Sequence, residues 1–210
     1  MQAALATNIG LVEDGYRSWF KDLKRILKFC NLEHLFYTSD YREIEYQIYN
    51  IKKRLKTMFI DKWKVDKLGF NNNSKLELFT SLKEDFGCSS YLLESKIPSF
   101  SMAITRLRIS AHKFPIETGR YLNTPREERV CPLGCRKIGD ELHYLTQCTH
   151  PFICDIRSKF IDNISKKYPG FPLLDSNEQC KLILNPVDPQ TLNDVGAFCC
   201  KVQNMFIELT

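Results

Sequence analysis

Three cysteines and one histidine lie within 18 residues in the second half of this 210-residue chain. Cys131, Cys135, His143 and Cys148 form the pattern C-x3-C-x7-H-x4-C. Thiolate sulfur and imidazole nitrogen are preferred zinc ligands, and structural zinc sites arrange four such groups as a tetrahedron around the ion. The spacing therefore predicts a structural Zn²⁺ site with four protein ligands and no open coordination position.

Turn and helix signals around these ligands indicate how the chain would bring them together. Pro132 and Gly134 favour a tight turn between the first two cysteines. Asp140 is a typical N-cap for a short helix over residues 141–148, which would carry the histidine near its start and the third cysteine at its end. The two halves of the site would thus come from separate local elements.

Two further donors follow the cluster closely. His150 and Cys154 are alternative ligands, chiefly in place of Cys135. The alternative to a metal site is that these cysteines are small apolar residues buried in a core, although three of them in so short a stretch favour a metal.

A family resemblance extends around the cluster. The stretch RLRISAHKFPIETGRYLNTPREERVCPLGCRKIGDELHYLTQC, residues 106–148, resembles the C-terminal zinc-binding segment of non-LTR retrotransposon reverse transcriptases. Those segments carry Arg/Ser/His and Ile-Glu-x-Gly-Arg blocks at this distance before their cysteines. The resemblance implies that the same three cysteines and His143 are the ligands. The chain departs from the family pattern by one extra residue, Gly134, in the first pair.

This resemblance also implies a function. In such elements the segment follows the polymerase and is assigned to binding template RNA or target DNA. The sequence contains no YADD-like pair of polymerase aspartates, no G-x-S-x-G and no phosphate-cradling glycine loop. We therefore expect a non-catalytic module, a fragment or standalone derivative of such a protein, with RNA or DNA as its partner.

Positive charge is concentrated just before the cysteine cluster. Residues 101–137 contain eight Lys/Arg against three Asp/Glu, in a chain with a formal net charge of +5. Because Lys and Arg bind phosphates, this block is the candidate nucleic-acid surface. The candidate binding residues are Arg106, Arg108, His112, Lys113, Arg120 and Arg129, followed by Arg126, Arg136 and Lys137, with Phe114 and Tyr121 as candidate stacking rings. Alternatively, Arg106 and Arg129 pair with Glu117, Glu127 or Glu128 and orient the loop over the metal.

Apolar residues recur at helical spacing along most of the chain, and strand-like alternation is nearly absent, so the sequence predicts a mostly α-helical fold. Helical patterns occupy residues 13–37, 40–67, 152–164 and the last 20 residues. One glycine and three asparagines predict a linker near residues 68–75. We expect a helical region over residues 1–97 and a zinc-binding-like helical domain over residues 98–210, with the CCHC module embedded in it.

The remaining features concern compartment and alternative functions. Nine cysteines, an odd number without an export signal, indicate the reducing nucleus or cytoplasm. No apolar run approaches the roughly 20 residues that cross a bilayer, so no membrane partner is expected.

The alternatives to nucleic-acid binding are a protein-interaction domain, an inert structural remnant and, remotely, a restriction-like nuclease. The apolar face over Leu192–Leu209 is a candidate for docking a partner helix, although core packing is favoured. The nuclease would need clustered carboxylates around a divalent ion, for which Asp175, Glu178 and Lys181 are the nearby candidates.

Overall fold

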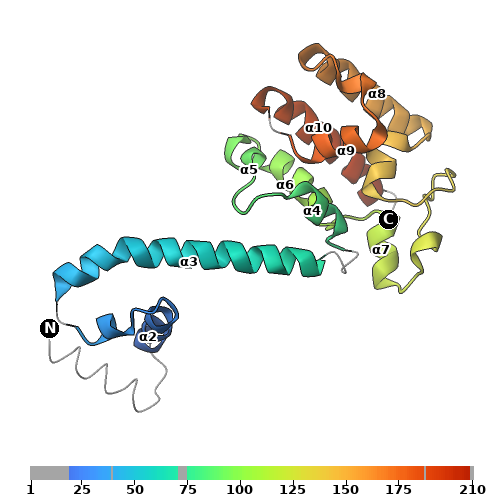
Figure 1. The fold of residues 1–210 in the computed structure, drawn as a ribbon. Helices are drawn as coiled ribbons and strands as arrows, with labels where there is room; N and C mark the ends of the chain where they lie inside the picture. Colours follow the sequence, from blue (N-terminus) through green and yellow to red (C-terminus); the bar gives the residue numbers. More distant parts are fainter. Residues whose placement is uncertain (1–18, 39, 71–74, 187, 209–210) are drawn as a thin grey trace. The chain divides into compact units, whose positions relative to one another are not determined.

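The computed structural model of this protein describes residues 19–38, 40–70, 75–186 and 188–208. The chain divides into two compact units, Met1–Asp66 and Lys67–Thr210. Helices make up the regular structure of the described residues, apart from one isolated antiparallel bridge between Val130 and Ile138 (Figure 1). The predicted mostly helical fold is confirmed.

The first unit contains α2 (Trp19–Phe29), the short 3-10 helix η1 (Glu33–Phe36) and most of α3 (Tyr41–Phe70). Between α2 and η1 the chain reverses at Asn31, whose φ of 56° lies in the left-handed region that asparagine tolerates at helix ends. The buried cluster of this unit consists of Phe20, Leu27, Cys30, Leu32, Leu35 and Phe36. From α3, Ile51 and Leu55 pack against this cluster, so one side of the long helix faces its core.

The second unit carries the remaining helices. They are α4 (Glu77–Leu82), α5 (Ser90–Glu94), α6 (Pro98–Arg108), α7 (Pro115–Tyr121), η2 (Arg126–Glu128), η3 (His143–Gln147), α8 (Pro151–Lys167), η4 (Phe171–Leu173), α9 (Ser176–Leu184) and α10 (Pro189–Glu208). Pro98, Pro115, Pro151 and Pro189 each occupy the start of a helix, where the missing N–H costs no hydrogen bond. Their placement explains where α6, α7, α8 and α10 begin.

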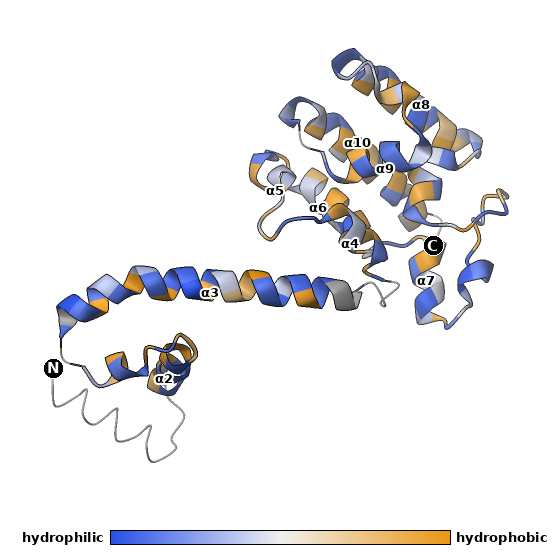
Figure 2. Ribbon diagram, in the orientation of Figure 1, coloured by the Kyte–Doolittle hydropathy of each residue, from blue (hydrophilic) through white to orange (hydrophobic). Residues whose placement is uncertain are grey.

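Helix α10 is the centre of the second unit and packs against α6 and α8. Hydrophobic residues recur along it in Figure 2. The rings of Phe198 in α10 and Phe160 in α8 stack with centroids 4.3 Å apart. The apolar face of α10 is buried at Leu192, Val195, Phe198, Cys199, Val202, Met205 and Phe206, while Leu209 lies outside the described residues. This stripe is therefore part of the core, which corrects its candidacy as a docking face for a partner.

The division between the units differs from the boundary expected at residues 97/98. Leu82 of α4 and Tyr91 of α5 are buried in the same cluster as the apolar face of α10, because the short helices before Pro98 supply part of that core. Helix α3 continues through Phe70, past the predicted start of the linker at residue 68, and residues 71–74 lie outside the described part of the chain.

One glycine sets how closely α10 and α6 approach. A Cβ atom at Gly196 would lie 2.3 Å from Cβ of Phe100. We expect Gly196→Ala to lower the free energy of unfolding by about 1–3 kcal/mol, because the helices must separate to admit the methyl group. Urea unfolding followed by circular dichroism measures this change.

Gly170→Ala is the matched control for that substitution. Its added Cβ would meet its nearest neighbour at 3.8 Å, and its φ of −75° suits alanine. We expect this control to be neutral or slightly stabilising. Equal stability of the two variants would contradict the close approach of α10 to α6.

Candidate metal centre

The four predicted ligands come together in the second unit. One ligand atom from each of Cys131, Cys135, His143 and Cys148 lies within 4.8 Å of the other three. The sulfur atoms of Cys135 and Cys148 are 3.6 Å apart. Zn–S bonds of about 2.3 Å in a tetrahedron place sulfurs about 3.8 Å apart, whereas a disulfide requires about 2.05 Å. The cluster therefore has the dimensions of a four-coordinate metal site.

The first two ligands sit on a turn closed by backbone pairing. Val130 bridges Ile138, and the N–H of Cys131 donates to the carbonyl oxygen of Lys137 at 2.7 Å. Within the turn, Gly134 has a φ of 90° and Arg136 a φ of 53°. The additional residue of the C-x3-C pair is thus accommodated by left-handed backbone, which glycine adopts without steric cost.

The other two ligands sit at opposite ends of a π-helical turn, η3. The N–H of Cys148 donates to the carbonyl oxygen of His143, five residues earlier, at 2.7 Å. In an α-helix, residues five apart point about 140° away from each other, whereas the wider π turn brings them onto one side. Asp140 caps the turn, since its Oδ1 accepts from the N–H of His143 at 2.8 Å. The capping prediction is confirmed, and the five-residue spacing is the signal that could have predicted the π turn.

His143 carries the observation that tests the fit of a metal. Its side chain is buried, with 2% of the residue exposed, and neither Nδ1 nor Nε2 has a hydrogen-bond partner among the described residues. Burial, followed by the charges of Lys137 and Arg157, lowers the pKa of His143 and favours the neutral imidazole. A neutral imidazole with an unpartnered nitrogen facing three sulfurs has the form of a metal ligand. Coordination of a metal ion would satisfy this nitrogen, which is otherwise costly to bury.

The thiols of the cluster have contrasting environments. Contact with the Thr149 hydroxyl, 3.4 Å away, lowers the pKa of Cys135 to about 7, with burial opposing and the Thr149 backbone N–H assisting. Burial raises the pKa of Cys148 to about 12, and the His150 backbone N–H opposes that rise. A bound divalent cation would favour the thiolate form of each ligand, with the residues after η3 supplying hydrogen-bond support.

The two alternative donors lie outside this group of four. Cys154 donates through Sγ to the carbonyl oxygen of Cys148 at 3.4 Å. Arg157 donates to the same oxygen at 2.6 Å and thereby ties α8 to the end of the π turn. His150 precedes α8 and supplies its backbone N–H near Cys148. In the structure, Cys135 completes the cluster in place of either alternative.

His112, expected to contact nucleic acid, belongs instead to a buried network beside the cluster. Its Nε2 lies 2.7 Å from Oε1 of Glu141, which also accepts from the Ser110 hydroxyl at 2.9 Å. The N–H of Phe114 donates to Nδ1 of His112 at 3.2 Å, so the proton is assigned to Nε2. The pKa of Glu141 is lowered, because these hydrogen bonds and His112 outweigh the effect of burial. The network fastens the Arg-Ile-Ser-x-His block to the start of the π turn.

Arg108 is likewise internal. With 2% of the residue exposed, it donates through Nη1 to the carbonyl oxygen of Leu184 at 2.6 Å and to Oδ1 of Asn185 at 2.8 Å. Its guanidinium lies 5.2 Å from the ring centre of Tyr91. Burial lowers the pKa of Arg108, opposed by Tyr91. The expectation that Arg108 binds phosphate is therefore corrected, since the side chain joins α6 to the end of α9.

Arg129 and Arg120 stabilise the loop before the cysteines. Arg129 donates to the carbonyl oxygens of Thr124 at 2.8 Å and Ile116 at 3.1 Å, in place of the expected glutamate partners. A Cβ at Gly119 would lie 2.6 Å from Arg129, which shows how closely the arginine covers α7. Arg120 lies 3.5 Å from the buried carboxylate of Glu117, so the internal ion pair of this loop is made by an arginine other than the two expected to form one.

The remaining candidates divide by exposure. Arg106 and Lys113 are exposed. Arg136 and Lys137 are exposed as well, and they lie on the turn between Cys135 and the bridge at Ile138. Tyr121 is 72% exposed, whereas Phe114 is fully buried and unable to stack on a base. The basic surface that remains available is therefore smaller than the sequence block and lies partly on the metal-binding turn itself.

The carboxylates considered for nuclease chemistry have a structural role. Oδ1 of Asp175 accepts from the N–H groups of Asn177 at 2.7 Å and Glu178 at 2.8 Å. The Glu178 carboxylate accepts from the N–H of Asp175 at 3.2 Å. These contacts are a capping box at the start of α9. The two carboxylates that would supply a nuclease centre thus cap a helix.

Comparison with protein-family models, with curated proteins and with solved structures finds no match to this chain. Over the described residues, none of the helices has both the length and the apolar character to cross a membrane. The molecule is thus defined by its own features, a helical fold with a buried Cys3His group that could hold a metal ion.

Proposed function

We propose that the second unit is a non-catalytic zinc-binding module that binds RNA or DNA through exposed basic residues beside a structural Cys3His site. The proposal includes descent from the C-terminal segment of a non-LTR retrotransposon reverse transcriptase. The observation that carries it is the convergence of the four ligand atoms within 4.8 Å at a turn that also presents Arg136 and Lys137 to solvent.

Four exposed cations define the proposed contact surface: Arg106, Lys113, Arg136 and Lys137. Among the described residues, none of the four side chains has an ion-pair partner. A metal that closes the turn would hold two of these cations at fixed positions, which lowers the entropic cost when they meet phosphates. Because backbone phosphates carry no sequence information, we expect weak sequence preference and strong salt dependence.

The test substitutes the two cations on the turn in the full-length chain. We expect Arg136→Gln/Lys137→Gln to weaken binding to a fluorescein-labelled 20-base-pair duplex and to reduce the slope of log affinity against log salt by about 2. Fluorescence anisotropy at 50–200 mM KCl measures both quantities.

The matched control removes the same charge elsewhere. Lys166 and Lys181 are exposed residues of α8 and α9 without ion-pair partners among the described residues. We expect Lys166→Gln/Lys181→Gln to leave the slope within about 0.5 of the wild-type value. If both pairs behave alike while the zinc content is unchanged, nucleic-acid binding at the turn is excluded, and a structural or protein-binding role becomes the better explanation.

A further inference from the structure

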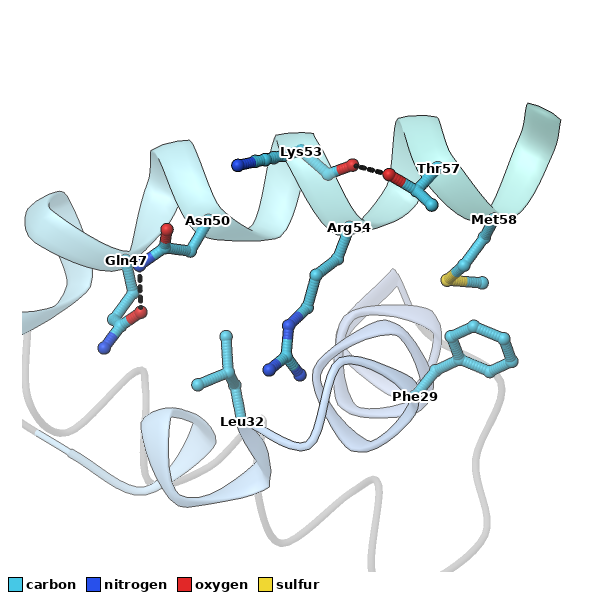
Figure 3. A pocket seen from close by; sticks show the side chains of 8 residues that line it. All are labelled: Phe29, Leu32, Gln47, Asn50, Lys53, Arg54, Thr57 and Met58. Carbon is cyan, nitrogen blue, oxygen red and sulfur yellow. Dashed lines mark hydrogen bonds between the residues drawn. The ribbon is translucent and has the colours of Figure 1, made fainter. Parts of the chain in front are cut away.

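The long helix of the first unit has two unlike sides. Its inner side packs Ile51 and Leu55 against the unit's core. In Figure 3, Arg54 points from α3 toward α2, where its guanidinium donates to the carbonyl oxygen of Cys30, and Met58 faces Phe29 across the pocket. This pocket of about 580 Å³ lies between α2 and α3, with Lys53 running along α3 at its edge.

Besides the exposed Glu45, the outer face of α3 presents two tyrosines and three lysines: Tyr46, Tyr49, Lys52, Lys53 and Lys56. At 3.6 residues per turn these five lie within about 120° of one another, and their centre is about 145° from the direction of Ile51 and Leu55. Tyr46 is 75% exposed and Tyr49 is 71% exposed, and the three lysines are exposed as well. Among the described residues, none of the five side chains has a hydrogen-bond or ion-pair partner.

The charge on this helix is unbalanced. Residues 52–67 hold seven Lys/Arg against two Asp, a net charge of +5 that equals the charge of the whole chain. Lys52 and Lys56 form a like-charge i,i+4 pair, which destabilises a helix by a few tenths of a kcal/mol, where a Glu–Lys pair would stabilise it. An excess of positive charge on one helix is electrostatically complementary to a polyanionic partner.

We infer that the outer face of α3 binds single-stranded nucleic acid, with the lysines on phosphates and the two tyrosines stacked on unpaired bases. Every base offers a π-face to an aromatic ring, so rings interspersed with lysines suit a strand whose bases are unpaired. A helix that lies on an anionic membrane instead separates a continuous apolar face from its charged face. Here the rings and the ammonium groups share one face. The inference does not rest on the proposed function of the metal-binding unit.

The experiment uses the full-length chain with fluorescein-labelled 20-nucleotide dT and rU strands. We expect Lys52→Gln/Lys53→Gln/Lys56→Gln to weaken binding about tenfold at 50 mM KCl and to reduce the salt slope by about 2, since each phosphate that a lysine neutralises on a single strand adds roughly 0.7 to that slope. We expect Tyr46→Ala/Tyr49→Ala to weaken it at least about thirtyfold with little change in salt slope, because stacking contributes at least about 1 kcal/mol per base and the variant removes two rings.

A charge-matched triple variant, Lys166→Gln/Lys181→Gln/Lys201→Gln, should bind single strands within twofold of wild type. A 20-base-pair duplex should be insensitive to the tyrosine variant, since its bases are already stacked. The inference is overturned if the α3 lysine variant equals this control while its helical circular dichroism is unchanged. It is also overturned if the lysine variant loses binding to phosphatidylserine vesicles but not to strands. The Arg136→Gln/Lys137→Gln variant, measured in parallel, reports separately on the metal-binding turn.

Discussion

Serine in place of Cys148 is expected to abolish stoichiometric zinc binding and to destabilise the second unit severely. The sulfur of Cys148 is fully buried at the end of the π turn and is adjacent to a second ligand sulfur. A structural zinc ion contributes on the order of 10 kcal/mol to folding a small module, which is comparable to the whole stability of a typical domain. Loss of even about 3 kcal/mol would lower the melting temperature by about 10 °C for a chain of this size.

Elemental analysis of the purified protein and thermal unfolding with and without a chelator measure this result. Wild type should hold one zinc ion per chain and lose stability in chelator, while Cys148→Ser should melt at the same temperature in both conditions. Cys88→Ser replaces an exposed cysteine outside the cluster and should retain the zinc. Folded wild-type protein that contains no transition metal and melts identically in chelator would refute the site.

The second large effect is expected at Arg108. Substitution by alanine leaves the carbonyl oxygen of Leu184 and the amide oxygen of Asn185 without their donor and opens a cavity beside Tyr91. Hydrogen bonds from charged donors contribute about 1.5–3 kcal/mol each, so we expect Arg108→Ala to cost roughly 3–5 kcal/mol. Urea unfolding of the full chain measures the loss.

Two companion variants separate this structural role from phosphate binding. Arg106 lies two residues earlier on α6 and is exposed, so Arg106→Ala should change stability by no more than about 0.5 kcal/mol. Arg108→Lys retains the charge but lacks the forked guanidinium, and we expect it to recover little of the stability that alanine removes. If Arg108→Lys is as stable as wild type, the contacts of the forked guanidinium with the end of α9 do not account for the stability that Arg108 contributes.

The metal ligands and the longest helices were predictable because both signals are local. Cysteine and histidine ligands at short spacing indicate a metal site whatever the surrounding fold. The spacing of apolar residues along α3 and α10 depends only on helix geometry. The start of α9 is a local feature as well, since Asp175 and Glu178 stand at the spacing of a capping box and form its two reciprocal hydrogen bonds.

The roles of the basic residues were harder to predict, because a charge pattern does not say which way a side chain faces. Arg106 and Arg108 point about 160° apart on a helix, and both can be solvated. A signal was nonetheless present in the sequence. Arg108 comes four residues after Ile104 and one after Leu107, which places it on the buried side of α6. The acceptors at the end of α9 are 76 residues away in sequence, and only the folded chain brings them to the arginine.

The backbone hydrogen bond that closes the π turn between His143 and Cys148 has a consequence for how this sequence can change in evolution. Tyr144–Gln147 act as a spacer of fixed length, and losing or gaining a single residue there would swing the terminal sulfur by about a quarter of a revolution, away from its three companions. Point substitutions at the partly exposed spacer positions, such as Thr146, leave that register intact. Descendant sequences could therefore drift in the identity of such positions, while an insertion or deletion in the spacer would abolish the site in one step.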